Sequence, residues 1–210
     1  TLEITQGTED PYRVAIIKFS GADKVTTDIQ KVVFDNLLRT GEFTIFKNED
    51  LLSIPQIEED IVFNDFRILD IDFLVMGKVE DDGLNIAVEY QVFDISKAKK
   101  IRTSTVYGIP NKNRQLAHYV SDGIYQEITG IPGIASTKIL YVTEDNNFKL
   151  LISDADGSNE QVLLESTEPI ISPSWSPDSK KVAYVSFETG IAKVYIQDIA
   201  SGNREVAVEN

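Results

Sequence analysis

The sequence predicts an α/β amino-terminal domain with a mixed sheet, followed by all-β blades of a β-propeller. Two observations support this prediction. Residues 1–132 alternate apolar strand segments with amphipathic helical segments, whereas residues 133–210 contain only short strand-like runs separated by turn residues. Within residues 133–210 the same strand-and-turn pattern occurs twice, offset by the 43 positions between Lys138 and Lys181, which is a blade-length period.

The amino-terminal domain is predicted to have the element order β-α-β-α-β-β-β-α. Residues 12–20 form a strongly apolar strand that we expect to be buried on both faces. Thr26 or Thr27 is expected to cap a helix that stops at Gly41. The other expected elements are strands at 43–46, 73–79, 85–94 and 100–107, a short helix within 57–70, and a helix at 113–129.

The second copy of the repeat is predicted to be a complete blade. A strand ends at Trp175, and strands follow at 181–187, 192–199 and 205–208, which gives the four antiparallel strands of one blade. We expect Trp175 to pack inside the blade rather than to bind a ligand. The first copy, within residues 138–165, has three strands and no counterpart of the strand that ends at Trp175.

Gly130-Ile-Pro-Gly133 ends the last helix and marks the predicted domain boundary. The predicted domains are therefore 1–132, with an extension at 1–6, and 133–210, which amounts to about one and three-quarter blades. The missing strand would leave the edge at Lys138–Thr143 unpaired, and such edges pair with other chains. We therefore expect this species to be oligomeric or prone to aggregation unless further polypeptide completes the ring.

Composition excludes several classes of function. The chain of 210 residues has no cysteine, which excludes disulfides, thiol catalysis and cysteine metal sites. Its net charge is −14, and acidic residues outnumber basic ones in both predicted domains, so nucleic acid is disfavoured as a partner. No apolar run is long enough for a membrane span, and no leader opens the sequence, so we expect any signal peptide to have been removed.

The sequence offers little catalytic or metal-binding chemistry. His118 is the only histidine, and it lies between Leu116 and Val120 but off their apolar stripe, so we expect a surface or boundary position. Residues 154–160 superficially resemble a calcium loop, yet they lack the required ligand spacing and are predicted to form a hairpin turn. We predict no catalytic residue, no metal site and no cofactor.

Several segments resemble one known family in the same order along the chain. Ser172-Pro-Ser-Trp-Ser-Pro-Asp-Ser-Lys-Lys-Val-Ala-Tyr-Val-Ser-Phe-Glu-Thr-Gly190 is similar to the propeller repeat of the TolB family of the bacterial Tol–Pal system. The preceding domain resembles the TolB amino-terminal domain in five segments, namely residues 13–19, 27–43, 72–79, 87–94 and 121–133. The resemblance covers essentially the whole chain.

This resemblance implies a function without catalysis. Family members are periplasmic adaptors that link the inner-membrane protein TolA to the outer-membrane lipoprotein Pal, and they support outer-membrane integrity and constriction during cell division. Other outer-membrane proteins and colicins are further partners that the resemblance implies. The family has a six-bladed propeller, so the resemblance implies that this chain carries an incomplete one.

The resemblance also implies two binding sites. The TolA-binding residues would be Leu2, Glu3, Ile4, Thr5 and Gln6, where apolar and polar residues alternate as in a strand that could add to a partner sheet. A frayed terminus is the alternative for this segment. The Pal-binding residues would be Glu168, Pro169, Ile170 and Ile171, although one of the two isoleucines could pack under the blade instead.

Two other functions remain open at this point. The chain could be the non-catalytic propeller fragment of a serine peptidase, but it shows neither a Gly-x-Ser-x-Gly nucleophile elbow nor a histidine downstream of one. It could also be a solute-binding module, but no cluster of polar ligand residues supports that reading. Binding assays with Pal and with the carboxy-terminal domain of TolA would discriminate among these functions.

Overall fold

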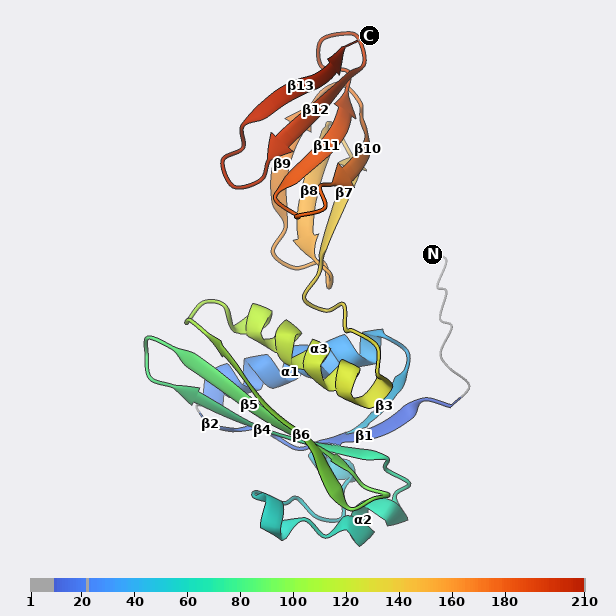
Figure 1. Cartoon of the computed structure of the whole chain (residues 1–210), viewed down its shortest axis with the longest axis vertical. Coiled ribbons are helices and arrows are strands. Elements are labelled where there is room, and N and C mark those ends of the chain that lie inside the picture. Colours follow the sequence, from blue (N-terminus) through green and yellow to red (C-terminus); the bar gives the residue numbers. More distant parts are fainter. Residues whose placement is uncertain (1–9, 22, 210) are drawn as a thin grey trace. The chain divides into compact units, whose positions relative to one another are not determined.

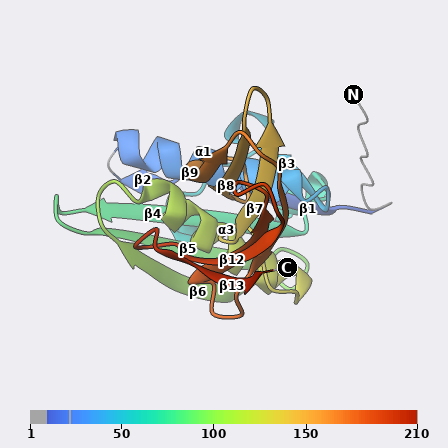
Figure 2. The same cartoon turned by 90° about the horizontal axis from the view of Figure 1, so that it is seen from above.

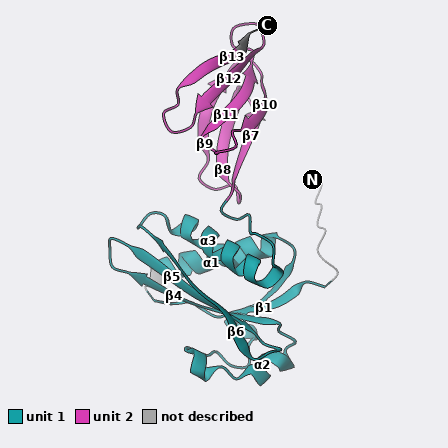
Figure 3. Cartoon of the chain, viewed as in Figure 1, with its two compact units in different colours: residues 1–136 teal, residues 137–210 magenta. Residues whose placement is uncertain are grey.

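The computed structural model describes residues 10–21 and 23–209, and the chain divides into two compact units, residues 1–136 and 137–210 (Figures 1 and 3). Residues 133–136 are therefore grouped with the first unit. Each unit has its own core.

The first unit is built on the mixed sheet that the sequence predicts. The strand order is β3-β1-β4-β5-β6, and β1 pairs in parallel with both β3 and β4. The pairs β4–β5 and β5–β6 are antiparallel. The strands are β1 (Tyr12–Ile16), β2 (Ser20–Gly21), β3 (Phe43–Phe46), β4 (Phe73–Asp81), β5 (Ile86–Asp94) and β6 (Lys99–Gly108).

Both faces of this sheet are covered. The helices α1 (Asp23–Arg39) and α3 (Asn113–Thr129) pack side by side on one face (Figures 1 and 2). The opposite face carries a thinner layer of η1 (Asn48–Asp50), η2 (Glu58–Asp60) and α2 (Phe63–Ile68). Strand β1 is buried on both faces, as predicted: Val14 and Ile16 belong to the core under α1 and α3, and Ala15 belongs to the core under α2.

Two expectations for this unit were wrong. The strand expected over 12–20 ends at Ile16, because the N–H groups of Lys18 and Phe19 leave the sheet ladder and bond to the side chains of Asn48 and Gln30. The first helix begins at Asp23 rather than after Thr26 or Thr27. Its apolar stripe already starts at Val25, which packs against the core, so Thr26 lies within the helix and is buried.

The second unit contains two antiparallel sheets. One has the order β10-β11-β12-β13, which is the predicted four-stranded blade, and the other has the order β7-β8-β9. In the latter sheet β7 is an outer strand within the described residues, as expected from the missing strand. The strands are β7 (Lys138–Glu144), β8 (Phe148–Asp154), β9 (Gln161–Ser166), β10 (Ile170–Trp175), β11 (Lys181–Ser186), β12 (Lys193–Asp198) and β13 (Arg204–Glu209).

Strand β10 has an irregular backbone that its sequence explains. Its pairing with β11 shifts register between Ile171 and Ser174, and Ser172 has a φ of 54°. Pro173 lies within this irregularity, on a strand at the edge of its sheet, where the missing N–H of proline costs no ladder bond. Trp175 at the end of the strand packs against the core, which confirms its predicted role.

Candidate interaction sites

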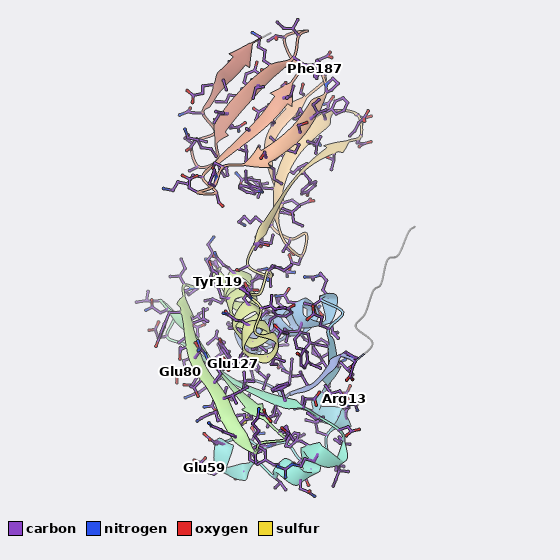
Figure 4. All side chains as sticks on the ribbon, turned by 45° about the vertical axis from the view of Figure 1, so that its right-hand side comes forward. Arg13, Glu59, Glu80, Tyr119, Glu127 and Phe187 are labelled. Carbon is purple, nitrogen blue, oxygen red and sulfur yellow. The ribbon has the colours of Figure 1, made fainter. Side chains whose placement is uncertain are left out.

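The expected TolA-binding residues, Leu2, Glu3, Ile4, Thr5 and Gln6, lie outside the described residues. The chain that follows them is firmly anchored. Tyr12 N–H donates to the carbonyl of Glu42 at 2.8 Å, and Arg13 N–H donates to a carboxylate oxygen of Asp72 at 2.9 Å. The Arg13 guanidinium donates to the carbonyl of Asp70 at 2.6 Å and lies 4.9 Å from the centre of the Phe46 ring (Figure 4). Removal of residues 1–6 would leave all of these contacts in place.

The expected Pal-binding residues lie at the start of β10 and in the loop before it. Glu168 is exposed, and its N–H donates to the Ser166 hydroxyl at 3.0 Å. The carbonyl of Pro169 accepts from the N–H of Phe187 at 3.2 Å. The two isoleucines separate: Ile170 is 2% exposed and belongs to the core, whereas Ile171 is 46% exposed. The surface that this segment offers to a partner is therefore formed by Glu168, Pro169 and Ile171.

The turn after β11, which bonds to this loop through the N–H of Phe187, also carries an ion pair. Glu188 accepts from Arg204 at 2.9 Å, and the Arg204 guanidinium lies 5.0 Å from the centre of the Tyr195 ring. Burial favours a higher pKa for Glu188, but the hydrogen bonds from Arg204 and Tyr195 and the positive charge of Arg204 outweigh it, so this pKa lies below its usual value. Glu188 is therefore ionised at neutral pH and holds Arg204 over Tyr195.

His118 is part of a buried polar network, so the expectation of a surface or boundary position was wrong. Asn36 on α1 donates through Nδ2 to His118 Nδ1 at 2.9 Å and to Ser121 Oγ at 3.0 Å. Its Oδ1 accepts from Arg39, which fixes the orientation of the amide. Ser121 is 1% exposed and donates to the carbonyl of Ala117 at 2.7 Å. A histidine and a serine held in this way join α1 to α3 and do not form a nucleophile with its base.

The acidic turn after β8 is a hairpin connection, as predicted. The N–H of Gly157 donates to the carbonyl of Asp154 at 2.9 Å, and the N–H of Ser158 donates to the side chain of Asp156 at 2.9 Å. The carboxylate of Asp154 accepts from Lys138 at 2.6 Å and from Asn159 at 2.5 Å. These bonds organise the turn around the Asp154 carboxylate.

Comparison with known proteins accounts for both units. Residues 1–101 match the TolB amino-terminal domain, and residues 125–210 match the TolB beta propeller domain. The Tol-Pal system protein TolB of Alcanivorax borkumensis is 38% identical over 97% of this chain, and that of Alkalilimnicola ehrlichii is 36% identical over 97%. The chain belongs to the TolB family. The two matches cover the α/β unit and the blades, and they occur in the order in which this family combines the two domains.

A solved structure gives the same result. The crystal structure of TolB from Acinetobacter baumannii superimposes with a TM-score of 0.88 and 34% identity, over 98% of this chain and 51% of that one. The chain spans about half the length of the curated relatives it matches, 48% for the Alcanivorax protein. In the part of the chain that the structure describes, no helix is long and apolar enough to cross a bilayer.

Proposed function

We propose that the protein is a non-enzymatic, periplasmic adaptor of the Tol–Pal cell-envelope system, which links TolA to Pal and supports outer-membrane integrity and constriction during cell division. The observation that carries this proposal is the 38% identity to a Tol-Pal system protein TolB over 97% of the chain. The buried, structural setting of His118 and Ser121 also supports a function without catalysis.

The TolA contact is assigned to Leu2, Glu3, Ile4, Thr5 and Gln6. Alternating apolar and polar residues suit a strand that adds to the edge of a partner sheet, where backbone hydrogen bonds provide most of the affinity. The described fold that follows this segment is anchored at Tyr12 and Arg13.

Deletion of residues 1–6 tests this assignment. Titration calorimetry with the carboxy-terminal domain of TolA should show complete loss of binding, while the melting temperature stays nearly unchanged, because the bonds of Tyr12 and Arg13 that anchor β1 remain in place. A control variant, Leu2→Ser with Ile4→Ser, removes only the apolar face of the strand and should weaken binding partially. Unaltered binding by the deletion variant would refute the assignment.

The Pal contact is assigned to the segment from Glu168 to Ile171, with Ile170 holding it in place from the core. A Glu168→Lys, Ile171→Asp variant of the full-length protein should weaken Pal binding by more than about 1 kcal/mol, a usual threshold for interface residues that matter. A Glu144→Lys, Val162→Asp variant reverses one charge and replaces one aliphatic residue by aspartate at other exposed positions of the second unit, and it should bind normally. Wild-type affinity in the first variant would remove this loop from the site.

A further inference from the structure

The layer that covers the second face of the first unit's sheet, residues 48–71, is apolar on both of its sides. Its inner side packs against the sheet through residues that include Leu51, Ile61 and Phe66. Five further large aliphatic residues of the layer are exposed, and we call these the outer aliphatic face: Leu52, Ile54, Ile57, Val62 and Ile68.

The exposed residues of this face are concentrated in a short stretch of the chain. Ile68 is 65% exposed, Leu52 is 59% exposed and Ile57 is 56% exposed, and all five residues come from the short segment 52–68. Single exposed aliphatic residues are normal on soluble proteins, but a concentration of them marks an interaction surface. The layer occupies the side of the unit opposite α1 and α3 (Figure 1), and Figure 4 shows Glu59 of this layer away from Tyr119 and Glu127 on α3.

The layer is held in a fixed position, so its exposed side chains form a defined surface. The N–H of Lys18 donates to the side chain of Asn48 at 3.0 Å, and Lys100 on β6 pairs with Glu58 at 2.5 Å. At the other end, Arg67 donates to the carbonyl of Ser96 at 3.4 Å. These bonds tie the layer to the sheet and to the β5–β6 turn.

A pocket of about 290 Å³ adjoins the outer aliphatic face. The layer stops short of the far end of the sheet, so residues 56–59 form one wall and the uncovered parts of β4 and β5 form the floor. The apolar part of the lining includes Ile57 and Met76. Its charged part consists of Glu58, Glu59, Glu89 and Lys78, and Lys78 is already paired with Glu80, so the lining is acidic on balance. This combination suits a side chain with an apolar stem and a positively charged end.

The charge around the face is negative. Residues 48–71 contain one basic residue, Arg67, and seven acidic residues, which are Glu49, Asp50, Glu58, Glu59, Asp60, Asp65 and Asp70. Within the described part of the chain, Glu58 is the only one of these acidic residues that forms an ion pair. An anionic lipid surface would be repelled by this charge, and a second copy of the chain carries a net charge of −14. The complementary occupant is a basic partner.

We propose that the outer aliphatic face and its adjoining pocket dock a positively charged, amphipathic segment of a partner protein. The apolar face of that segment would cover Leu52, Ile57 and Ile68, and its lysine or arginine side chains would pair with the unpaired acidic residues around them. A lysine stem would enter the pocket beside Ile57 and Met76, with its ammonium group near Glu59 and Glu89. This surface includes none of the residues assigned to the two contacts of the proposed function.

The test uses a fluorescein-labelled helical peptide of leucine and lysine, about 18 residues long and amphipathic, and a scrambled peptide of the same composition. Fluorescence anisotropy measures the binding of both peptides to the whole chain. An Ile57→Ser, Ile68→Ser variant removes part of the apolar face, and a Glu59→Lys, Asp60→Lys variant removes part of its charge. The matched controls are Leu84→Ser with Ile109→Ser, and Glu144→Lys with Asp145→Lys, all at exposed positions elsewhere.

We expect each variant at the outer aliphatic face to weaken binding of the amphipathic peptide at least about tenfold, while both controls stay within about twofold of the wild type. The scrambled peptide should bind weakly to every variant. Equal weakening by face and control variants would show that only net charge matters and would overturn the proposal. Sedimentation that reveals self-association abolished by Ile57→Ser, Ile68→Ser would also overturn it, because the occupant would then be a second copy.

Discussion

In the first unit the sheet has a hydrophobic core on each of its two faces, whereas in the second unit two sheets share a single small core. The α/β unit has one core beneath α1 and α3 and another beneath α2. Among the described residues, the main core cluster of the second unit contains six buried residues, which are Leu150, Ile152, Ile170, Val182, Tyr184 and Tyr195. A sheet covered on both faces is self-sufficient, but a blade depends on what packs against it. The difference predicts that the two units respond separately, and unequally, to substitution.

The largest expected effect comes from cavities in the two cores. Leu74 and Leu150 are both 0% exposed, and replacement of either by alanine removes about 3 kcal/mol from the unit that contains it. We expect Leu74→Ala to lower the unfolding transition of the first unit and leave it folded. Leu150→Ala should leave the second unit largely unfolded, because its small core provides little stability in reserve.

Residue-resolved hydrogen exchange measures both outcomes, since amide protons of β4 and β5 report on the first unit and those of β8 and β11 on the second. Ile171→Ala, at a half-exposed position of the second unit, is a control that should change neither set much. If Leu74→Ala and Leu150→Ala both accelerated exchange throughout the chain, the units would fold as one body and the comparison would fail.

The next effect concerns the space around two glycines. Gly123 in the first unit is closely packed, whereas Gly157 in a turn of the second unit is not. A methyl group at Gly123 on α3 would collide with the hydroxyl group of Tyr90 on β5, so the helix would have to move away from the sheet. We expect Gly123→Ala to destabilise the first unit by about 2 kcal/mol. Gly157 has open space around it but a φ of +80°, so Gly157→Ala should cost the second unit only about 1 kcal/mol.

Chemical denaturation, followed by a probe in each unit, measures these two values. A Gly123→Ala, Tyr90→Phe double variant removes the colliding hydroxyl group and should recover part of the lost stability. Equal destabilisation by Gly123→Ala with and without Tyr90→Phe would show that the Tyr90 hydroxyl is not the obstacle.

A smaller effect distinguishes equivalent turns in the two units. Asp94 accepts from Ser96 at 2.7 Å and from Lys97 Nζ at 2.6 Å. Burial favours a higher pKa for Asp94, but the hydrogen bonds from Lys97 and Ser96 outweigh it and hold the pKa at about 2. Asp198 organises the turn after β12 through Ser201, whose backbone N–H and hydroxyl lower the pKa of Asp198 at a partly exposed position.

Because the pKa of Asp94 is depressed on folding, its contribution is present above about pH 4, the usual value for aspartate, and is lost as the pH falls through about 2. We expect Asp94→Asn to reduce the stability of the first unit by about 1–2 kcal/mol at pH 7 and by much less at pH 2. Asp198→Asn should have a smaller effect on the second unit. Denaturation at several pH values measures both, and a loss for Asp94→Asn that does not change with pH would contradict the ionic contribution.

Features that depend on residues close together in the sequence could be predicted, whereas features that depend on residues far apart could not. The blade strands, the hairpin at Asp154 and the core position of Trp175 follow from alternation and turn residues within a few positions of one another, and the structure confirms them. The position of His118 depends on Asn36, which is 82 residues away in the sequence, so no local pattern could indicate it. The early start of α1 was within reach, because Val25 already continues the apolar stripe.

The burial of Ile170 beside the exposed Ile171 shows the same limit within one candidate site. Alternation along a strand predicts that neighbouring residues face opposite ways, but the sequence alone does not say which of the two faces the core. The pairing of Ile170 with Ser186 and of Ile171 with Val185 decides it, and this register depends on the neighbouring strand. The outer aliphatic face was missed for a similar reason, since its five residues resemble core residues until the fold shows which side of the layer they occupy.

The smallest expected effect concerns the chain between the units. Asp122 on α3 accepts the N–H groups of Ala135 at 2.7 Å and of Ser136 at 3.0 Å, which ties the end of the first unit to its last helix. Asp122→Ala removes both acceptors and leaves the core intact, so the melting temperature of either unit should change little. The amide protons of Ala135 and Ser136 should instead exchange at least about tenfold faster, because their protection depends on these two bonds. Asp122→Asn keeps one oxygen acceptor and should show an intermediate rate. Unchanged exchange at Ala135 and Ser136 in Asp122→Ala would contradict this prediction, because it would mean that other contacts protect these two amide protons.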